Sequence, residues 1–190
     1  MMTKALVLLA DGFEELEAIA VADVMDRGGV EVTRASLGGA DMLVAAHGTR
    51  VAADCNLDGA VSRQGEFDAI VLPGGSQGTR NLMEDSRVGG LLRDFAGSGR
   101  LVAAICAAPM ALGAVGLLSG RRFTCYPGCE TAIKGGEYTD ALPVVADGNI
   151  LTSRGPGTAI DFGLAIVERL VSREAAQRVA QGMLYPQCRN

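Results

Sequence analysis

The chain has 190 residues, of which 48% are apolar and 21% are charged, a composition typical of a folded globular protein and not of a disordered one. Its formal net charge of -5 argues against a nucleic-acid or anionic-membrane partner, because such surfaces attract basic proteins. No apolar run approaches the ~20 residues of a membrane-spanning helix, and the short N-terminal run does not fit a secretory signal. We therefore expect a cytoplasmic protein, with residues 1–190 forming a single domain.

Strand-like and helix-like segments alternate in the first half of the chain. An unbroken apolar run at 5–10 predicts a buried strand, and the segment 14–29, with acids in its first turn and glycines at its end, predicts a helix. Alternating apolar positions predict a strand over 30–37. Residues 40–58 are less regular and suggest a hairpin around His47. The run 67–75 predicts another buried strand that ends in a Pro-Gly-Gly turn.

The same alternation continues to the C-terminal part. We expect a helix over 88–95, a strand over 100–105, a helix over 109–118, a short strand and turn within 121–129, a hairpin within 142–153, and one long helix over 158–180. Thr158 is the expected N-cap of that helix, with Asp161 at its third position. The whole pattern predicts an α/β fold, namely a flavodoxin-like, doubly wound, mostly parallel sheet with helices on both faces.

The cysteine and histidine contents restrict the chemistry. The five cysteines, Cys55, Cys106, Cys125, Cys129 and Cys188, are odd in number and irregularly spaced, which favours reduced thiols over a disulfide framework. The single histidine excludes a metal site with several histidines in one chain. Cys125 and Cys129 could supply two zinc ligands, but no second pair completes a site. We expect neither a metal nor a cofactor.

Three strand ends, at residues 10–12, 73–75 and 105–107, are expected on one edge of the parallel sheet, where ligands bind in such folds. Cys106 lies there, at a strand-to-helix turn. Ala104 and Ala108 flank it, as small residues flank the nucleophile of a G-x-S-x-G elbow. From the residues alone, Cys106 is either a nucleophile or a buried packing thiol.

If Cys106 is a nucleophile, its place before a helix that begins at Pro109 should lower its pKa below the ordinary thiol value of ~8.5. The backbone N–H groups of Ala107 and Gly75 could then receive a developing oxyanion.

Three acids, Glu14, Glu15 and Glu17, occupy the start of the first helix. Carboxylates there stabilise the helix without any catalytic role. Helical spacing puts both Glu15 and Glu17 on apolar stripes, so the pattern does not separate them. A buried carboxyl would have a raised pKa and could donate a proton to a neighbouring sulfur.

Four stretches, ALVLLADGFEELEA, VLPGG, AAICAAP and LTSRGPGTAIDFGLAIVE, together resemble the ThiJ/PfpI superfamily and specifically its DJ-one branch, which includes the Parkinson-disease-associated deglycase and bacterial YajL-type relatives. The resemblance runs from residue 4 to about residue 182. It implies that Cys106 is a redox-sensitive nucleophile and Glu17 the protonated acid beside it. It also implies an oxyanion pocket around Gly74, Gly75 and Ala107, a structural or anion-orienting Arg154, and a homodimer with the cysteine close to the interface.

One position departs from the family pattern. Many members carry a histidine beside the cysteine, where this chain has Tyr126. A tyrosine, with an ordinary pKa of ~10, is a poor base near neutrality, so we expect Tyr126 to be a pocket wall or a hydrogen-bond donor. His47 could substitute only if the fold or a partner subunit brought it close; otherwise it is a surface-loop histidine. Cys125 is either a resolving thiol or a packed bystander.

The resemblance implies a cofactor-independent cysteine enzyme that acts on small reactive aldehydes, by glyoxalase-type conversion to a hydroxy acid or by deglycation. The alternative is a redox-responsive stress protein, with client proteins as partners, whose Cys106 oxidises to sulfinate. A protease or amidase has little support without a histidine beside the cysteine.

Overall fold

A seven-stranded sheet forms the centre of the computed structural model, which describes residues 2–186. All its neighbouring strands pair in parallel except the edge strand β10, which pairs antiparallel with β11. In spatial order the strands are β10 (Val144–Asp147), β11 (Ile150–Ser153), β7 (Leu101–Ile105), β6 (Ala69–Leu72), β1 (Lys4–Leu9), β2 (Glu31–Ser36) and β5 (Cys55–Asn56). The predicted doubly wound α/β fold is confirmed.

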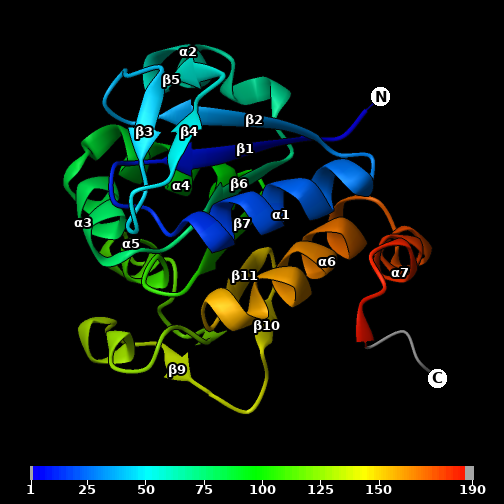
Figure 1. Cartoon of the computed structure of the whole chain (residues 1–190). Coiled ribbons are helices and arrows are strands. Elements are labelled where there is room, and N and C mark those ends of the chain that lie inside the picture. The colour runs from blue at the N-terminus through cyan, green and yellow to red at the C-terminus, as the bar shows by residue number, and fades with distance from the viewer. Residues whose placement is uncertain (1, 187–190) are drawn as a thin grey trace.

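Helices cover both faces of this sheet (Figure 1). One face packs against α1 (Glu15–Arg27), α6 (Ala159–Leu170) and α7 (Arg173–Gly182), and the other against α2 (Leu57–Ser62), α3 (Ser76–Glu84), α4 (Ser86–Gly97) and α5 (Pro109–Ala114). Along β1, Val7 and Leu9 point into the first core, whereas Leu6 and Leu8 point into the second. A strand that is buried on both faces needs apolar residues at every position, which explains the unbroken run.

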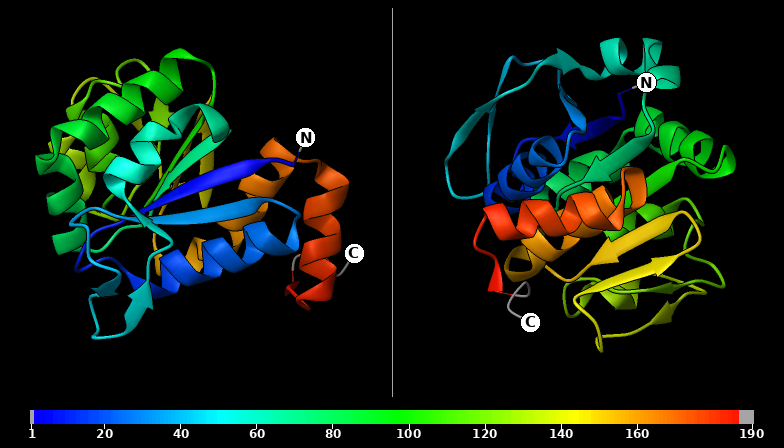
Figure 2. Two further views of the ribbon diagram at one scale, coloured as in Figure 1. Left: turned by 90° about the horizontal axis from the view of Figure 1, so that it is seen from above. Right: turned by 90° about the vertical axis from the view of Figure 1, so that its right-hand side faces the viewer.

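Three smaller pieces complete the chain. An antiparallel hairpin, β3 (Met42–Val44) and β4 (Arg50–Ala52), carries the predicted turn at His47 and lies beside the start of α1 (Figure 2, left). A two-stranded sheet joins β8 (Arg122–Phe123) to β9 (Glu137–Tyr138). Short 3₁₀ turns lie at η1 (Gln64–Glu66), η2 (Cys129–Ala132) and η3 (Pro156–Thr158). Within residues 2–186, no helix has both the length and the apolar character required to cross a bilayer.

The predicted single helix over 158–180 is wrong. The chain forms α6 and α7, because Val171 leaves the helical conformation and the Ser172 side chain caps α7 by accepting a hydrogen bond from Ala175 N at 3.1 Å. Thr158 precedes α6 as predicted, but its hydroxyl does not cap the helix; it contacts Ser153 Oγ at 2.7 Å instead.

Two other helices differ from the expectation. The helix expected over 109–118 ends at Ala114, so α5 has only six residues. The sequence reasoning also missed α3, which begins directly after the glycine turn of residues 74–75. This helix contacts the loop after β1 and brings Ser76, Gln77 and Arg80 to the carboxyl edge of the sheet.

Candidate active site

The loops that follow β1 and β6 are held together at the carboxyl edge of the sheet. Glu14 N donates to Gly74 O at 3.1 Å, and Gly78 N donates to Gly12 O at 3.2 Å. Gly75 has a φ of 86°, and a side chain there would collide with the Gly12 carbonyl oxygen. This position therefore requires glycine both for its conformation and for the close approach of the two loops.

Cys106 is the first residue after β7 and has a φ of 64°, in the left-handed region that residues with side chains rarely adopt. Its N–H donates to Ser153 O at 3.0 Å, and its carbonyl accepts from Tyr126 N at 2.8 Å. Ala104 and Ala108 on either side are fully buried. The predicted elbow is confirmed: small neighbours permit a tight turn that presents the half-buried thiol at the edge of the sheet.

Glu17 is the acid that the fold places against this thiol. Its side chain is 0% exposed, whereas Leu16 and Ile19 on the same helix are 52% and 44% exposed. Glu17 Oε2 accepts a hydrogen bond from Gly74 N at 2.7 Å, and the carboxyl interacts with the Cys106 side chain. Oε1 is buried and has no hydrogen-bond partner among the described residues. A buried, incompletely solvated oxygen disfavours the charged form.

Burial therefore raises the pKa of Glu17 to about 7, although the hydrogen bonds from Gly74 and Cys106 oppose the shift. Burial, together with the charge of Glu17, raises the pKa of Cys106 to about 12, against the hydrogen bonds that Gly75 and Ala107 N–H groups donate to its sulfur. Because the two groups share one small site, they titrate as a pair. The first proton leaves Glu17 near pH 7, and the negative charge of the carboxylate then keeps the proton on the Cys106 thiol.

The predicted lowering of the Cys106 pKa is thus wrong: burial and the charge of Glu17 raise it. The prediction relied on a helix dipole, but α5 is short and begins three residues later, at Pro109. The local N–H donors are too few to outweigh burial and the neighbouring carboxylate. The thiolate instead depends on proton transfer to Glu17.

The predicted oxyanion residues divide into two groups. Gly75 and Ala107 direct their N–H groups to the sulfur. Gly74 does not, because its N–H is bonded to Glu17. Gly74 also lies too close to Cys106 and Glu17 to carry a side chain, since a Cβ there would be 2.5 Å from Cys106 Cβ. The absence of a side chain at Gly74 therefore lets the Glu17 carboxyl and the Cys106 thiol approach each other closely.

Cys106 opens into a cleft of about 850 Å³. Tyr126, which is 51% exposed, lines this cleft as the predicted wall residue. Arg154 is not among the lining residues; its Nη1 donates to Asp140 O at 3.1 Å, which favours the structural role over the anion-orienting one.

The other cysteines differ in burial and in whether they line the cleft of Cys106. Cys125 is fully buried, as expected of a packed thiol, whereas Cys129 lines the cleft. Cys55 is half-buried in β5, and Cys188 lies outside the described residues. The sequence reasoning did not place Cys129 at the cleft, nor Arg80, which α3 brings there. The glycine turn before residue 76 was the available signal for a strand–turn–helix unit.

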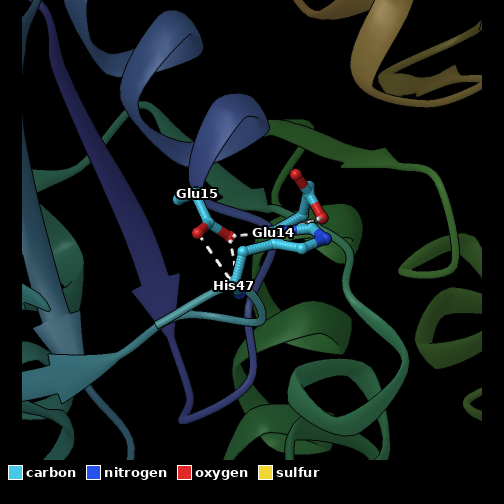
Figure 3. Close-up of side chains that lie close together, drawn as sticks. All are labelled: Glu14, Glu15 and His47. Atoms are coloured by element: carbon cyan, nitrogen blue, oxygen red, sulfur yellow. Dashed lines mark hydrogen bonds and ion pairs between the residues drawn. The ribbon is translucent and has the colours of Figure 1, made fainter. Parts of the chain in front are cut away.

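His47 also lines the cleft, from the turn between β3 and β4. Its Nδ1 lies 3.1 Å from Glu15 Oε2 and 3.7 Å from Glu14 Oε2 (Figure 3). Its backbone N–H donates to Glu15 as well, at 3.2 Å. These three side chains bring their ligand-type atoms within 4.8 Å of one another. The fold has thus brought the only histidine to the same cleft as Cys106.

A cysteine in a left-handed elbow, paired with a buried acid at the carboxyl edge of a doubly wound sheet, defines a class of α/β proteins. The chain belongs to the DJ-1/PfpI family, whose sequence profile matches residues 3–169. It is 44% identical over 185 residues to Protein dj-1beta of Drosophila melanogaster, covering 97% of this chain and 98% of the relative. The crystal structure of that protein superposes with a TM-score of 0.93 over 97% of this chain and 98% of the other.

A second relative carries an enzyme's name. The Caenorhabditis elegans protein named glutathione-independent glyoxalase DJR-1.2 is 37% identical over 187 residues, covering 97% of this chain and 95% of the relative. The relatives support a glyoxalase-type role in general terms.

Proposed function

We propose that this protein is a cofactor-independent glyoxalase that converts small α-oxoaldehydes such as methylglyoxal to hydroxy acids. The observation that carries the proposal is the Cys106–Glu17 pair, in which a thiol that lines an open cleft contacts a buried acid. The name of the C. elegans relative supports the same reaction class.

The chemistry begins with proton transfer within the pair. Ionised Glu17 takes the proton of the Cys106 thiol as the sulfur attacks the aldehyde carbon, and the N–H groups of Gly75 and Ala107 stabilise the oxyanion that forms. Glu17 returns the proton to that oxygen and forms the hemithioacetal. It next moves a proton from C1 to C2 through an enediol, which leaves a hydroxyacyl thioester on Cys106. Water releases the hydroxy acid and restores the thiol.

Lactate formation from methylglyoxal, without added thiol, tests the proposal. Wild-type protein should turn over repeatedly, and both Cys106→Ser and Glu17→Gln should lose most of the activity. The rate should rise with pH through about 7, where Glu17 becomes able to accept the thiol proton. No turnover by the wild type would reject the glyoxalase function. Addition of a Michael-type thiol reagent to Cys106 then shows independently whether the sulfur is reactive.

A second function rests on the same donors. Peroxide would oxidise the Cys106 thiolate stepwise to sulfinate, each peroxide giving one oxygen to sulfur and leaving as water. The Gly75 and Ala107 N–H groups and protonated Glu17 are the donors that would hold the new oxygens. Oxidation of Cys106 under mild peroxide, in a protein without aldehyde turnover, would favour this redox-responsive role.

A cytoplasmic location is also proposed. The free cysteines among the described residues fit a reducing compartment.

The expected homodimer is a further proposal. Exposed apolar side chains on α1 and β3, near the cleft, would be covered by a second copy of the chain: Leu16, Ile19, Met42 and Val44. Sedimentation equilibrium should show a dimer for the wild type and a monomer for Leu16→Asp. A monomeric wild type would reject the proposal.

A further inference from the structure

The proposed glyoxalase reaction, on which this inference rests, leaves one step without an assigned base. Release of the hydroxyacyl group requires a water molecule to attack the thioester, and water is a poor nucleophile unless a base takes its proton. Glu17 is 0% exposed and is bonded to Gly74 and Cys106, so it faces the sulfur and not the solvent. Tyr126 also lines the cleft, but a phenol is a poor general base near neutral pH.

His47 is placed to meet this need. It lines the same cleft as Cys106, and its side chain is 72% exposed, so it contacts both the substrate space and bulk water. An ionised carboxylate only accepts hydrogen bonds, so the 3.1 Å contact with Glu15 assigns the proton to His47 Nδ1. The neutral ring then carries its free lone pair on Nε2, which is the atom that can accept a proton.

Glu15 is held rigidly for this task. It accepts hydrogen bonds from His47 N and His47 Nδ1 (Figure 3). Thr49 Oγ1 donates a further hydrogen bond to it, at 3.0 Å. Although partial burial opposes ionisation, the backbone N–H of Glu15 itself and the hydrogen bonds from His47 and Thr49 lower the pKa of Glu15 to about 2, so it is charged throughout the physiological range. A carboxylate–imidazole pair of this kind fixes the tautomer and orientation of a histidine base.

We propose that His47, oriented by Glu15, is the base that activates the water for release of the acyl group from Cys106. Water attacks the thioester carbonyl carbon and gives its proton to His47 Nε2. The carbon–sulfur bond then breaks, its electron pair stays on sulfur, and His47 returns the proton to the Cys106–Glu17 pair. Glu15 is a positioning residue, because it acts through the imidazole.

The pH dependence of the step has a defined sign. Neutral His47 is the active form, so acyl release should rise with pH through the His47 pKa. The hydrogen bond that His47 donates to Glu15 and the negative charges of Glu14 and Glu15 raise that pKa above 6.5. No other residue of the turn 45–49 titrates. The other titratable groups that line the cleft are Asp11, Glu14, Arg80, Cys106, Tyr126 and Cys129.

The test isolates acyl release from aldehyde chemistry. p-Nitrophenyl acetate acetylates the thiol in a single turnover, and peptide mass spectrometry follows loss of the acetyl group from Cys106. His47→Gln should retain the acetyl group about 10²-fold longer than the wild type, the lower end of the usual contribution of a general base. Arg50→Gln is the matched control, because it introduces the same side chain at the exposed start of β4, next to this turn; it should release the acetyl group at the wild-type rate.

Two readouts separate a catalytic role from a structural one. Added imidazole should restore acyl release in His47→Gln, and Glu15→Gln should move the midpoint of the pH profile downward. Equal release rates in the wild type and His47→Gln, or acetyl-Cys106 that the wild type never releases, overturn the inference. His47-dependent release in a protein that does not convert methylglyoxal would reject the glyoxalase proposal alone.

Discussion

Replacing Glu17 with glutamine should stabilise the protein while it impairs the chemistry. The glutamine carboxamide has the shape of the protonated acid. Its oxygen can accept the hydrogen bond from Gly74 N, and its NH₂ can donate to the Cys106 sulfur. Glu17→Gln therefore keeps the contacts of the buried side chain and removes only its ability to ionise.

The magnitude follows from proton linkage. Burial raises the Glu17 pKa from 4.5 to about 7, so the folded state binds this proton more tightly than the unfolded state. Stability should consequently be highest below about pH 4.5, fall as the pH rises, and level off above about 7. At ~1.4 kcal/mol for each tenfold change in proton affinity, ionised Glu17 costs the fold about 3 kcal/mol at pH 8. Glu17→Gln has no such cost.

Urea unfolding of the wild type and of Glu17→Gln across the pH range measures this difference. From low pH to pH 8, the free energy of unfolding of the variant should rise by about 3 kcal/mol relative to that of the wild type. This difference corresponds to roughly 6–12 °C in Tm for a chain of this size. Glu168→Gln, an exposed position on α6, controls for the chemical change. If the stabilities of the wild type and Glu17→Gln changed in parallel with pH, Glu17 would not be a buried carboxyl with a raised pKa.

Three further outcomes test the site and the core. Ultraviolet titration of the thiol should show a lower Cys106 pKa in Glu17→Gln than in the wild type, because the variant removes the neighbouring negative charge; an unchanged midpoint would contradict the coupling. Gly75→Ala should lose at least about 2 kcal/mol by urea unfolding, since it forces a side chain into a left-handed turn against Gly12, and wild-type stability would contradict that contact. Phe162→Ala should cost about 3–5 kcal/mol in the same assay, because it empties a fully buried core site, and a loss below about 1 kcal/mol would show that α6 repacks.

Much of the architecture could be predicted from local pattern. Buried strands such as 5–10 and 100–105 are short, unbroken and apolar because both faces of a parallel sheet are covered, so composition alone marks them. Strand polarity then places their carboxyl ends on one edge, which brought Cys106 to the correct place. The small residues beside it indicated the elbow for a steric reason that does not depend on distant parts of the chain.

Other features depend on contacts that no local pattern encodes. Apolar stripes did not separate Glu15 from Glu17; the rotation of α1 against the sheet buries Glu17 and leaves Glu15 to bind the hairpin. The helix expected over 158–180 breaks at Ser172, whose cap competes with helix continuation. The Cys106 pKa was predicted in the wrong direction because the neighbouring carboxyl comes from a residue 89 positions earlier in the chain.

The residue types and their order thus determined the fold class, the elbow and the identity of the thiol, because each follows from sterics or burial within a few residues. Local sequence pattern left open which acid meets that thiol, although the family resemblance implied Glu17. Tertiary structure decided that contact, the site at which the proton is held, and that His47 reaches the cleft. Those properties arise from desolvation and from contacts between loops far apart in sequence, and both exist only once the sheet and its helices have packed.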